Sequence, residues 1–104
     1  MHTKFDFQKS VIQESYNQPV IVEFSSPGCG PCIWMEKILV EVVREMPDQV
    51  HFVSIPISDC PECVEQYEIK SNPATIFFSN GEPKLRLKGA YPKIVVEQWI
   101  RDQL

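Results

Sequence analysis

The chain has 104 residues, 43% of them hydrophobic and 11% aromatic, and carries a formal net charge of −4. This length and apolar content predict a single globular domain, residues 1–104, with one core. The acidic balance, with no basic block, argues against nucleic acid or an anionic membrane as a partner. No apolar run approaches the roughly 20 residues of a membrane span, and the N-terminus lacks a signal-peptide pattern, so we expect a protein of the reducing cytoplasm. We also expect a monomer.

The first predicted element is a helix over residues 5–16, which the sequence Asn17-Gln18-Pro19 ends. Its positions at helical spacing are Phe7, Val11, Ile12 and Ser15. The next run, Val20–Phe24, is almost continuously β-branched or aromatic. Such a run is typical of a central strand that is covered on both faces.

The strongest helix prediction covers residues 32–46. Its apolar stripe consists of Met35, Ile38, Leu39, Val42, Val43 and Met46. A second strand is predicted over residues 50–57, where Pro56 is tolerable only near the strand end or at a sheet edge. Strand, helix and strand together predict a βαβ unit with parallel strands.

The second half of the chain predicts a short helix, a hairpin and a closing helix. The short helix spans about residues 60–69, with Asp59 and Glu62 as a capping pair. Strands at 74–79 and 84–88 flank the two-residue turn Asn80-Gly81. The closing amphipathic helix carries Val95, Val96, Trp99, Ile100 and Leu104. The whole predicts an α/β fold, a βαβ unit followed by a ββα unit, in which helices flank both faces of a central mixed sheet.

A Cys-x-x-Cys motif, Cys29-Gly30-Pro31-Cys32, lies between the first predicted strand and the helix that follows it. At a helix N-terminus, unpaired backbone N–H groups and the helix dipole stabilise a thiolate. Pro31 fixes φ in the first turn and holds the two sulfur atoms at a nearly constant separation. The motif therefore predicts a redox-active dithiol, with Cys29 as the exposed nucleophile and Cys32 as the shielded resolving thiol.

Glu23 stands inside the apolar run of the first strand. Burial of an ionised carboxylate is costly, so its pKa should rise toward neutrality, as a proton acceptor for a thiol requires. The alternative is that Glu23 faces solvent or pairs with a lysine.

Several features together resemble the thioredoxin family. They are the motif at 29–32, the preceding Val22-Glu23-Phe24, Pro73 before the third predicted strand, the Asn80-Gly81 turn and Gly89-Ala90 after the fourth strand. Their order and spacing cover nearly the whole chain from about Pro19 onward. The resemblance implies a thioredoxin-like fold.

The resemblance also implies roles for individual residues. Cys29 would attack a disulfide, Cys32 would resolve the product, and Glu23 would assist deprotonation of the resolving thiol. Pro73 would be a cis-proline whose neighbouring backbone, next to Asn72, binds the substrate chain as a short added strand. The alternative is an ordinary trans proline at the start of a strand. This cycle needs no cofactor and no metal.

Some positions depart from the family pattern. Gly28 and Ser25 replace aromatic residues, Ile33 and Ser54 replace lysines, Lys37 replaces a proline, and Asn72 replaces an apolar residue or threonine. The thiol chemistry is retained, but the surface that selects a partner is predicted to differ. Ile33 and Trp34 beside the small Gly28 could form an apolar contact surface, unless Trp34 packs on the sheet.

A second motif, Cys60-Pro61-Glu62-Cys63, follows the second predicted strand. Because parallel strands end at the same edge of a sheet, we expect Cys60 at the edge that carries Cys29. Three interpretations are open. The pair is a second redox couple that exchanges electrons with the first or switches its activity, or all four cysteines bind zinc, or the cysteines are small buried side chains.

The function predicted from these observations is thiol–disulfide exchange with a protein or small disulfide substrate, supported by an upstream electron donor. The alternative from another class is a thioredoxin-fold binding or redox-sensing adaptor with little turnover, regulated by its two cysteine pairs.

Overall fold

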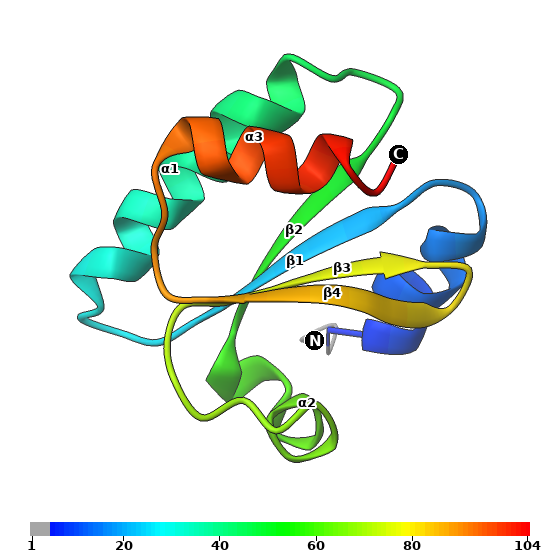
Figure 1. Cartoon of the computed structure of the whole chain (residues 1–104). Coiled ribbons are helices and arrows are strands. Elements are labelled where there is room, and N and C mark those ends of the chain that lie inside the picture. Colours follow the sequence, from blue (N-terminus) through cyan, green and yellow to red (C-terminus); the bar gives the residue numbers. More distant parts are fainter. Residues whose placement is uncertain (1–4) are drawn as a thin grey trace.

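A four-stranded mixed sheet forms the centre of the computed structural model, which describes residues 5–104 (Figure 1). Its strands are β1 (Val20–Ser25), β2 (His51–Pro56), β3 (Ala74–Ser79) and β4 (Glu82–Lys88). Their order in the sheet is β2-β1-β3-β4. β1 is parallel to β2 and antiparallel to β3, which in turn is antiparallel to β4. The predicted mixed sheet is confirmed.

Helices cover both faces of this sheet (Figure 1). One face carries α1 (Gly30–Arg44) and α3 (Lys93–Arg101), and the other carries α2 (Pro61–Gln66) together with the N-terminal segment. The chain therefore runs as β1-α1-β2 followed by β3-β4-α3, which is the predicted order of a βαβ unit and a ββα unit. Among the described residues, no helix has the length and hydropathy needed to cross a membrane.

Alternation of side chains along the strands divides the core into two clusters. In β1, Val20, Val22 and Phe24 pack on the α2 face, whereas Ile21 packs beneath α1 and α3. This alternation puts Glu23 on the same face as Ile21. Since β1 is a central strand covered on both sides, its first five residues are all buried, as the continuous run predicts.

The N-terminal helix differs from its prediction. In place of one helix over residues 5–16, the chain forms a π-helix, η1 (Gln8–Gln13), and a 3₁₀ turn, η2 (Glu14–Tyr16). The hydroxyl of Ser15 donates to the Ile12 carbonyl over 2.6 Å and accepts a hydrogen bond from the Gly81 N–H over 2.8 Å. The second of these bonds attaches the end of the segment to the β3–β4 turn, a contact that the sequence pattern does not predict.

Several other boundaries move. α1 begins at Gly30, because Cys29 is its N-cap, and it ends at Arg44, two residues before the predicted end. The predicted capping pair of Asp59 and Glu62 is wrong, since Asp59 ends a 3₁₀ turn, η3 (Ile57–Asp59), and Cys60 is the N-cap of the shorter α2.

The ends of the other elements shift as well. β4 begins two residues before the predicted residue 84. Val95 and Leu104 were expected on the buried stripe of the closing helix, but both are exposed. Leu104 lies beyond α3, which ends at Arg101. Within α3, the buried residues are Val96 and Ile100, and Val95 lies outside that stripe.

The hairpin turn and the proline in the second strand agree with expectation. Asn80 and Gly81 both have positive φ, at 53° and 81°, which the two-residue turn requires. Pro56 ends β2, and β2 lies at an edge of the sheet, where a missing N–H costs no ladder hydrogen bond.

Candidate active site

The motif at residues 29–32 forms the junction between β1 and α1. Cys29 is the N-cap of α1, and the Cys32 N–H donates a hydrogen bond to its Sγ over 3.1 Å. The two cysteines form a disulfide with their Cα atoms 5.2 Å apart. Cys29 is partly exposed, whereas Cys32 is 3% exposed. One sulfur can therefore be approached from solvent, and the other lies beneath it.

The first turn of α1 favours a thiolate at Cys29. α1 has 15 residues, so its dipole and unpaired N–H groups act at full strength on its N-cap. Pro31 lies in this turn, where its missing N–H costs nothing. Gly28, just before Cys29, has a φ of 71°, a conformation that is strained for other residues. The aromatic residue usual in the family would be strained at this position.

An apolar surface adjoins the dithiol. Ile33 and Trp34 are 58% and 60% exposed. The alternative in which Trp34 packs on the sheet is therefore wrong. Both side chains come from the first turn and a half of α1, and they are the large apolar groups nearest in sequence to Cys32.

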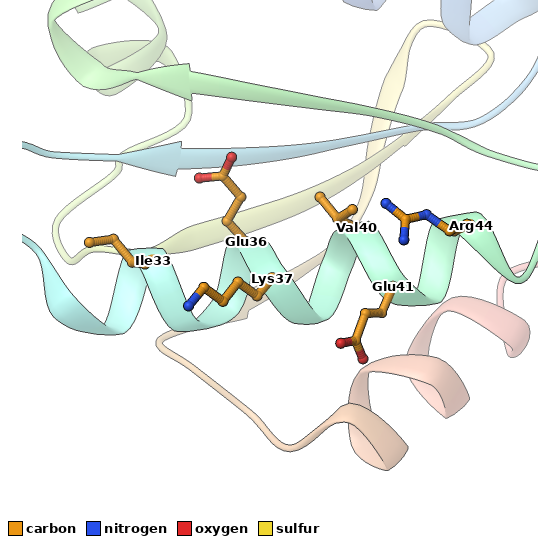
Figure 2. A pocket seen from close by; sticks show the side chains of 6 residues that line it. All are labelled: Ile33, Glu36, Lys37, Val40, Glu41 and Arg44. Atoms are coloured by element: carbon orange, nitrogen blue, oxygen red, sulfur yellow. The ribbon is translucent and has the colours of Figure 1, made fainter.

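Glu23 is completely buried, at 0% exposure, and neither of its carboxylate oxygens has a hydrogen-bond partner among the described residues. The alternative of a solvent-facing or lysine-paired Glu23 is wrong. Burial raises the pKa of this carboxyl to about 8, and the negative charge of Glu36 adds to the rise. Figure 2 shows Glu36 projecting from α1 toward the strands of the sheet. At pH 7 the Glu23 carboxyl is therefore mostly protonated.

Two residues beside Glu23 were not predicted. Thr75 lies directly opposite it in the β1–β3 register and is completely buried, with an unpartnered hydroxyl oxygen. Glu36 follows Cys32 by one helical turn. Only the strand register and the packing of α1 bring these two residues to Glu23. Ser54, its register partner in β2, is exposed, and brings no positive charge to the position where the family often has a lysine.

The loop before β3 lies against the loop that carries Cys29. The Asn72–Pro73 peptide bond is cis, as the resemblance implies, and Pro73 is buried. The side-chain amide of Asn72 donates a hydrogen bond to the Ser26 hydroxyl over 3.1 Å. On the other side, the Gly89 N–H donates to the Pro73 carbonyl over 2.8 Å. Asn72, a departure from the family pattern, thus connects the two loops that surround the dithiol.

A groove of about 480 Å³ runs along α1 (Figure 2). Its lining residues are Ile33, Glu36, Lys37, Val40, Glu41 and Arg44. None of the cysteines lines it, and most of the lining side chains are charged. The groove therefore does not contain the dithiol, although Ile33 lines it and Glu36 acts from it on the pKa of Glu23.

The second cysteine pair has different surroundings. Cys60 and Cys63 form a disulfide with their Cα atoms 5.2 Å apart, and each is only 1% exposed. They belong to the core cluster on the α2 face, together with Phe7 and Tyr67. Both pairs follow the carboxyl ends of the parallel strands, but they lie on opposite faces of the sheet. Nowhere in residues 5–104 do three or more metal-ligating side chains of His, Cys, Asp or Glu come together.

Comparison with known proteins gives one consistent result. The family model described as Thioredoxin matches residues 1–102. Thioredoxin Y, chloroplastic, from Oryza sativa subsp. japonica is 35% identical over 91 residues, which are 88% of this chain and 54% of that protein. Thioredoxin M-type, chloroplastic, from Spinacia oleracea is 34% identical over 86 residues, which are 83% of this chain and 48% of that protein.

A shorter relative is covered more fully. Thioredoxin 1 from Synechococcus elongatus is 33% identical over 91 residues, which are 88% of this chain and 83% of that protein. The chain thus spans about half the length of the two plant relatives and most of the Synechococcus one. The family match over nearly all of its residues, the mixed sheet and the dithiol at the start of α1 lead to one conclusion: the chain belongs to the thioredoxin family.

Proposed function

We propose that the chain is a thiol–disulfide oxidoreductase that reduces a disulfide in a protein or small-molecule substrate. The observation that carries the proposal is the pairing of a partly exposed Cys29 at the N-cap of α1 with a buried Cys32 three residues later. That pairing provides the exposed nucleophile and the shielded resolving thiol that exchange requires. Relatives that carry the name thioredoxin support the same class of reaction.

The reaction has two steps. The Cys29 thiolate attacks one sulfur of the substrate disulfide, forms a mixed disulfide and releases the other sulfur as a thiolate. Cys32 loses its proton and attacks Cys29 Sγ, which breaks the mixed disulfide and releases the second substrate thiolate. Two electrons have passed to the substrate, and the Cys29–Cys32 bond has formed. An upstream donor restores the dithiol, and neither step requires a cofactor.

In this proposal the ionised form of Glu23, about a tenth of the carboxyl at pH 7, accepts the proton of Cys32. Its pKa of about 8 lies close to that of a free thiol, about 8.5, so proton transfer between the two groups is nearly balanced. The segment at Asn72 and Pro73 binds the substrate chain beside the dithiol. The proposal includes a single-domain monomer in a reducing compartment, the cytoplasm, where a dithiol of this kind is kept available.

Reduction of a protein disulfide with dithiothreitol as electron source tests the proposal. The assay compares the wild type with Cys29→Ser and Cys32→Ser. We expect turnover to be lost in both variants, with the Cys32→Ser variant accumulating a mixed disulfide at Cys29. Equal rates in all three proteins would rule the proposal out.

The second candidate function is a redox-sensing adaptor with little turnover. It is favoured by exposed Ile33 and Trp34 next to a dithiol whose flanking family aromatics are replaced by Gly28 and Ser25. Turnover no higher than that of dithiothreitol alone, together with redox-dependent binding of a partner, would favour the adaptor. Capture of partners through a Cys32→Ser mixed disulfide, followed by measured turnover on those partners, separates the two functions.

A further inference from the structure

The Cys60–Cys63 disulfide lies away from the proposed active site and needs its own explanation. Its sulfurs are packed among aromatic side chains on the α2 face, where the rings of Phe7 and Tyr67 lie 5.7 Å apart between centroids. The dithiol of α1 is on the other face of the sheet. Direct exchange between the pairs would require Cys60 or Cys63, each 1% exposed, to leave this core and reach Cys29. The interpretation as an electron relay to Cys29 is therefore not supported by the geometry.

A pocket of about 340 Å³ lies beside one of the two cysteines. It lies between the start of the N-terminal segment and α2, and it is lined by Phe5, Asp6, Phe7, Gln8, Glu62, Cys63 and Gln66. Cys63 lines this pocket and Cys60 does not. A protein substrate could not reach a cysteine that is 1% exposed, whereas a reagent of a few heavy atoms would fit in this pocket next to Cys63.

The lining also determines which reagents are favoured. Asp6 and Glu62 bring two carboxylates, and the described lining residues include no cationic side chain. The attacking thiolate itself carries one negative charge, so a thiol with further anionic groups would be repelled most, whereas one with an ammonium group, whose thiolate has no net charge, would be favoured. The six-residue α2 is too short to supply a strong dipole field to these sulfurs, so access and charge decide their reactivity.

We propose that Cys60–Cys63 is a second redox couple, which exchanges with small neutral or cationic thiols through the pocket beneath residues 5–8, independently of Cys29 and Cys32. A small thiolate attacks Cys63 Sγ, forms a mixed disulfide there and expels Cys60 as a thiolate, which takes up a proton. A second small thiolate attacks the sulfur of the bound reagent and releases Cys63 as a thiol. Two reagent thiols have supplied two electrons and two protons, and they leave as a small disulfide.

The test uses a chain in which Cys29→Ser and Cys32→Ser remove the first pair, so that its result is separate from that of the proposed function. Cys60→Ser is added to leave Cys63 as the only thiol, and in a matched variant Cys63→Ser leaves Cys60. Each protein is incubated with cystamine, and adduct formation is followed by intact mass. We expect the adduct at Cys63 to form about tenfold faster than at Cys60, with circular dichroism confirming that both variants are folded. Equal rates, or a faster reaction at Cys60, would overturn the proposal.

The charge preference has its own control. In the Cys63-only chain, the rate of adduct formation with each reagent is divided by the rate for the same chain unfolded in urea. We expect this ratio to be about threefold higher for cystamine than for glutathione disulfide. Asp6→Asn with Glu62→Gln should remove most of this preference. An unchanged preference would show that the pocket is not the route.

A second measurement applies if the single-thiol variants do not fold. The chain with only the first pair replaced is equilibrated with reduced and oxidised cysteamine, and the Cys60–Cys63 bond is quantified by peptide mass spectrometry. A reversible two-electron titration of the folded chain is expected. A bond that is reduced only in denaturant, or only when Cys29 and Cys32 are present, would refute the proposal.

Discussion

The two cysteine pairs share a spacing and an internal proline, and in both pairs the Cα atoms are 5.2 Å apart, yet their surroundings are opposite. Cys29 is partly exposed at the start of a 15-residue helix, while Cys60 and Cys63 are almost completely buried beside a six-residue helix. The spacing of a Cys-x-x-Cys motif therefore determines whether a disulfide can form. The neighbouring segments determine what can reach it.

The side chains beside the two cysteine pairs differ as well. The first pair is followed in α1 by the exposed side chains of Ile33 and Trp34, and Cys29 itself is partly exposed. The second pair is covered by Phe7, which makes aromatic contacts with Phe24, Tyr67 and Phe78. We therefore expect the first disulfide to react with macromolecules and the second with small reagents alone.

Alkylation of the reduced chain is the largest expected contrast. With iodoacetamide at neutral pH, we expect Cys29 to react on the order of 10³-fold faster than Cys60 and about 10²-fold faster than Cys63, which lines the pocket. The larger factor corresponds to a local opening free energy of about 4 kcal/mol at Cys60. Peptide mass spectrometry over time measures the rates. Comparable rates at all three sites would mean that burial does not distinguish the pairs.

Removal of each disulfide is expected to have unequal effects on stability. Closing a four-residue loop contributes about 2 kcal/mol in the chain-entropy description, and this contribution is the same for both pairs. Replacement of both Cys60 and Cys63 by alanine also empties core volume, so we expect a loss of about 3 to 4 kcal/mol in the free energy of unfolding.

Cys29→Ala with Cys32→Ala is the matched control. It should cost about 1 kcal/mol less, because Cys29 is partly exposed and leaves no closed cavity. Urea unfolding of the oxidised proteins measures both losses. A smaller loss for the Cys60 and Cys63 variant would contradict the assignment of that pair to the core.

Glu23, a buried residue of β1, makes the stability of the protein depend on pH. Its carboxyl has a pKa of about 8 in the folded chain, against 4.5 as its ordinary value. Between these pH values the folded state holds more protons, so the free energy of unfolding decreases as the pH rises from about 4.5 to 8 and then levels off. We expect Glu23→Gln to remove a decrease of about 5 kcal/mol, measured by urea unfolding of the oxidised protein.

Glu36→Gln is the control for this prediction. Since the charge of Glu36 adds to the rise of the Glu23 pKa, its removal should move the decrease in stability to lower pH without abolishing it. A pH profile of Glu23→Gln that matches the wild type would show that the buried carboxyl is not the titrating group.

The order of elements and the first cysteine pair could be predicted because they depend on local patterns. The continuous apolar run over residues 20–24, the helical stripe after Cys32 and the Asn80-Gly81 turn each determine structure within a few residues. Burial of Glu23 also follows from its position inside the apolar run, since a strand covered on both faces buries both sets of side chains.

The rest depends on contacts between segments distant in the chain. Thr75 meets Glu23 only through the β1–β3 register, and Ser15 ends the N-terminal segment through a bond to Gly81, 66 positions later. The opposite placement of the two cysteine pairs has the same origin. Parallel strands predict a shared edge for Cys29 and Cys60, but which face of the sheet each helix covers depends on tertiary packing.

The smallest predicted effect concerns the polar link at the first pair. Asn72 donates its side-chain hydrogen bond to Ser26 and so ties the loop before β3 to the loop carrying Cys29. In a double-mutant cycle of Asn72→Ala and Ser26→Ala, we expect a coupling of about 1 kcal/mol in the free energy of unfolding. Because this bond lies at the first pair only, each variant should change alkylation of Cys29 and leave the protection of Cys60 and Cys63 as in the wild type. Equal changes at both pairs would show that the two sites are coupled through the sheet, against the independence that their opposite faces imply.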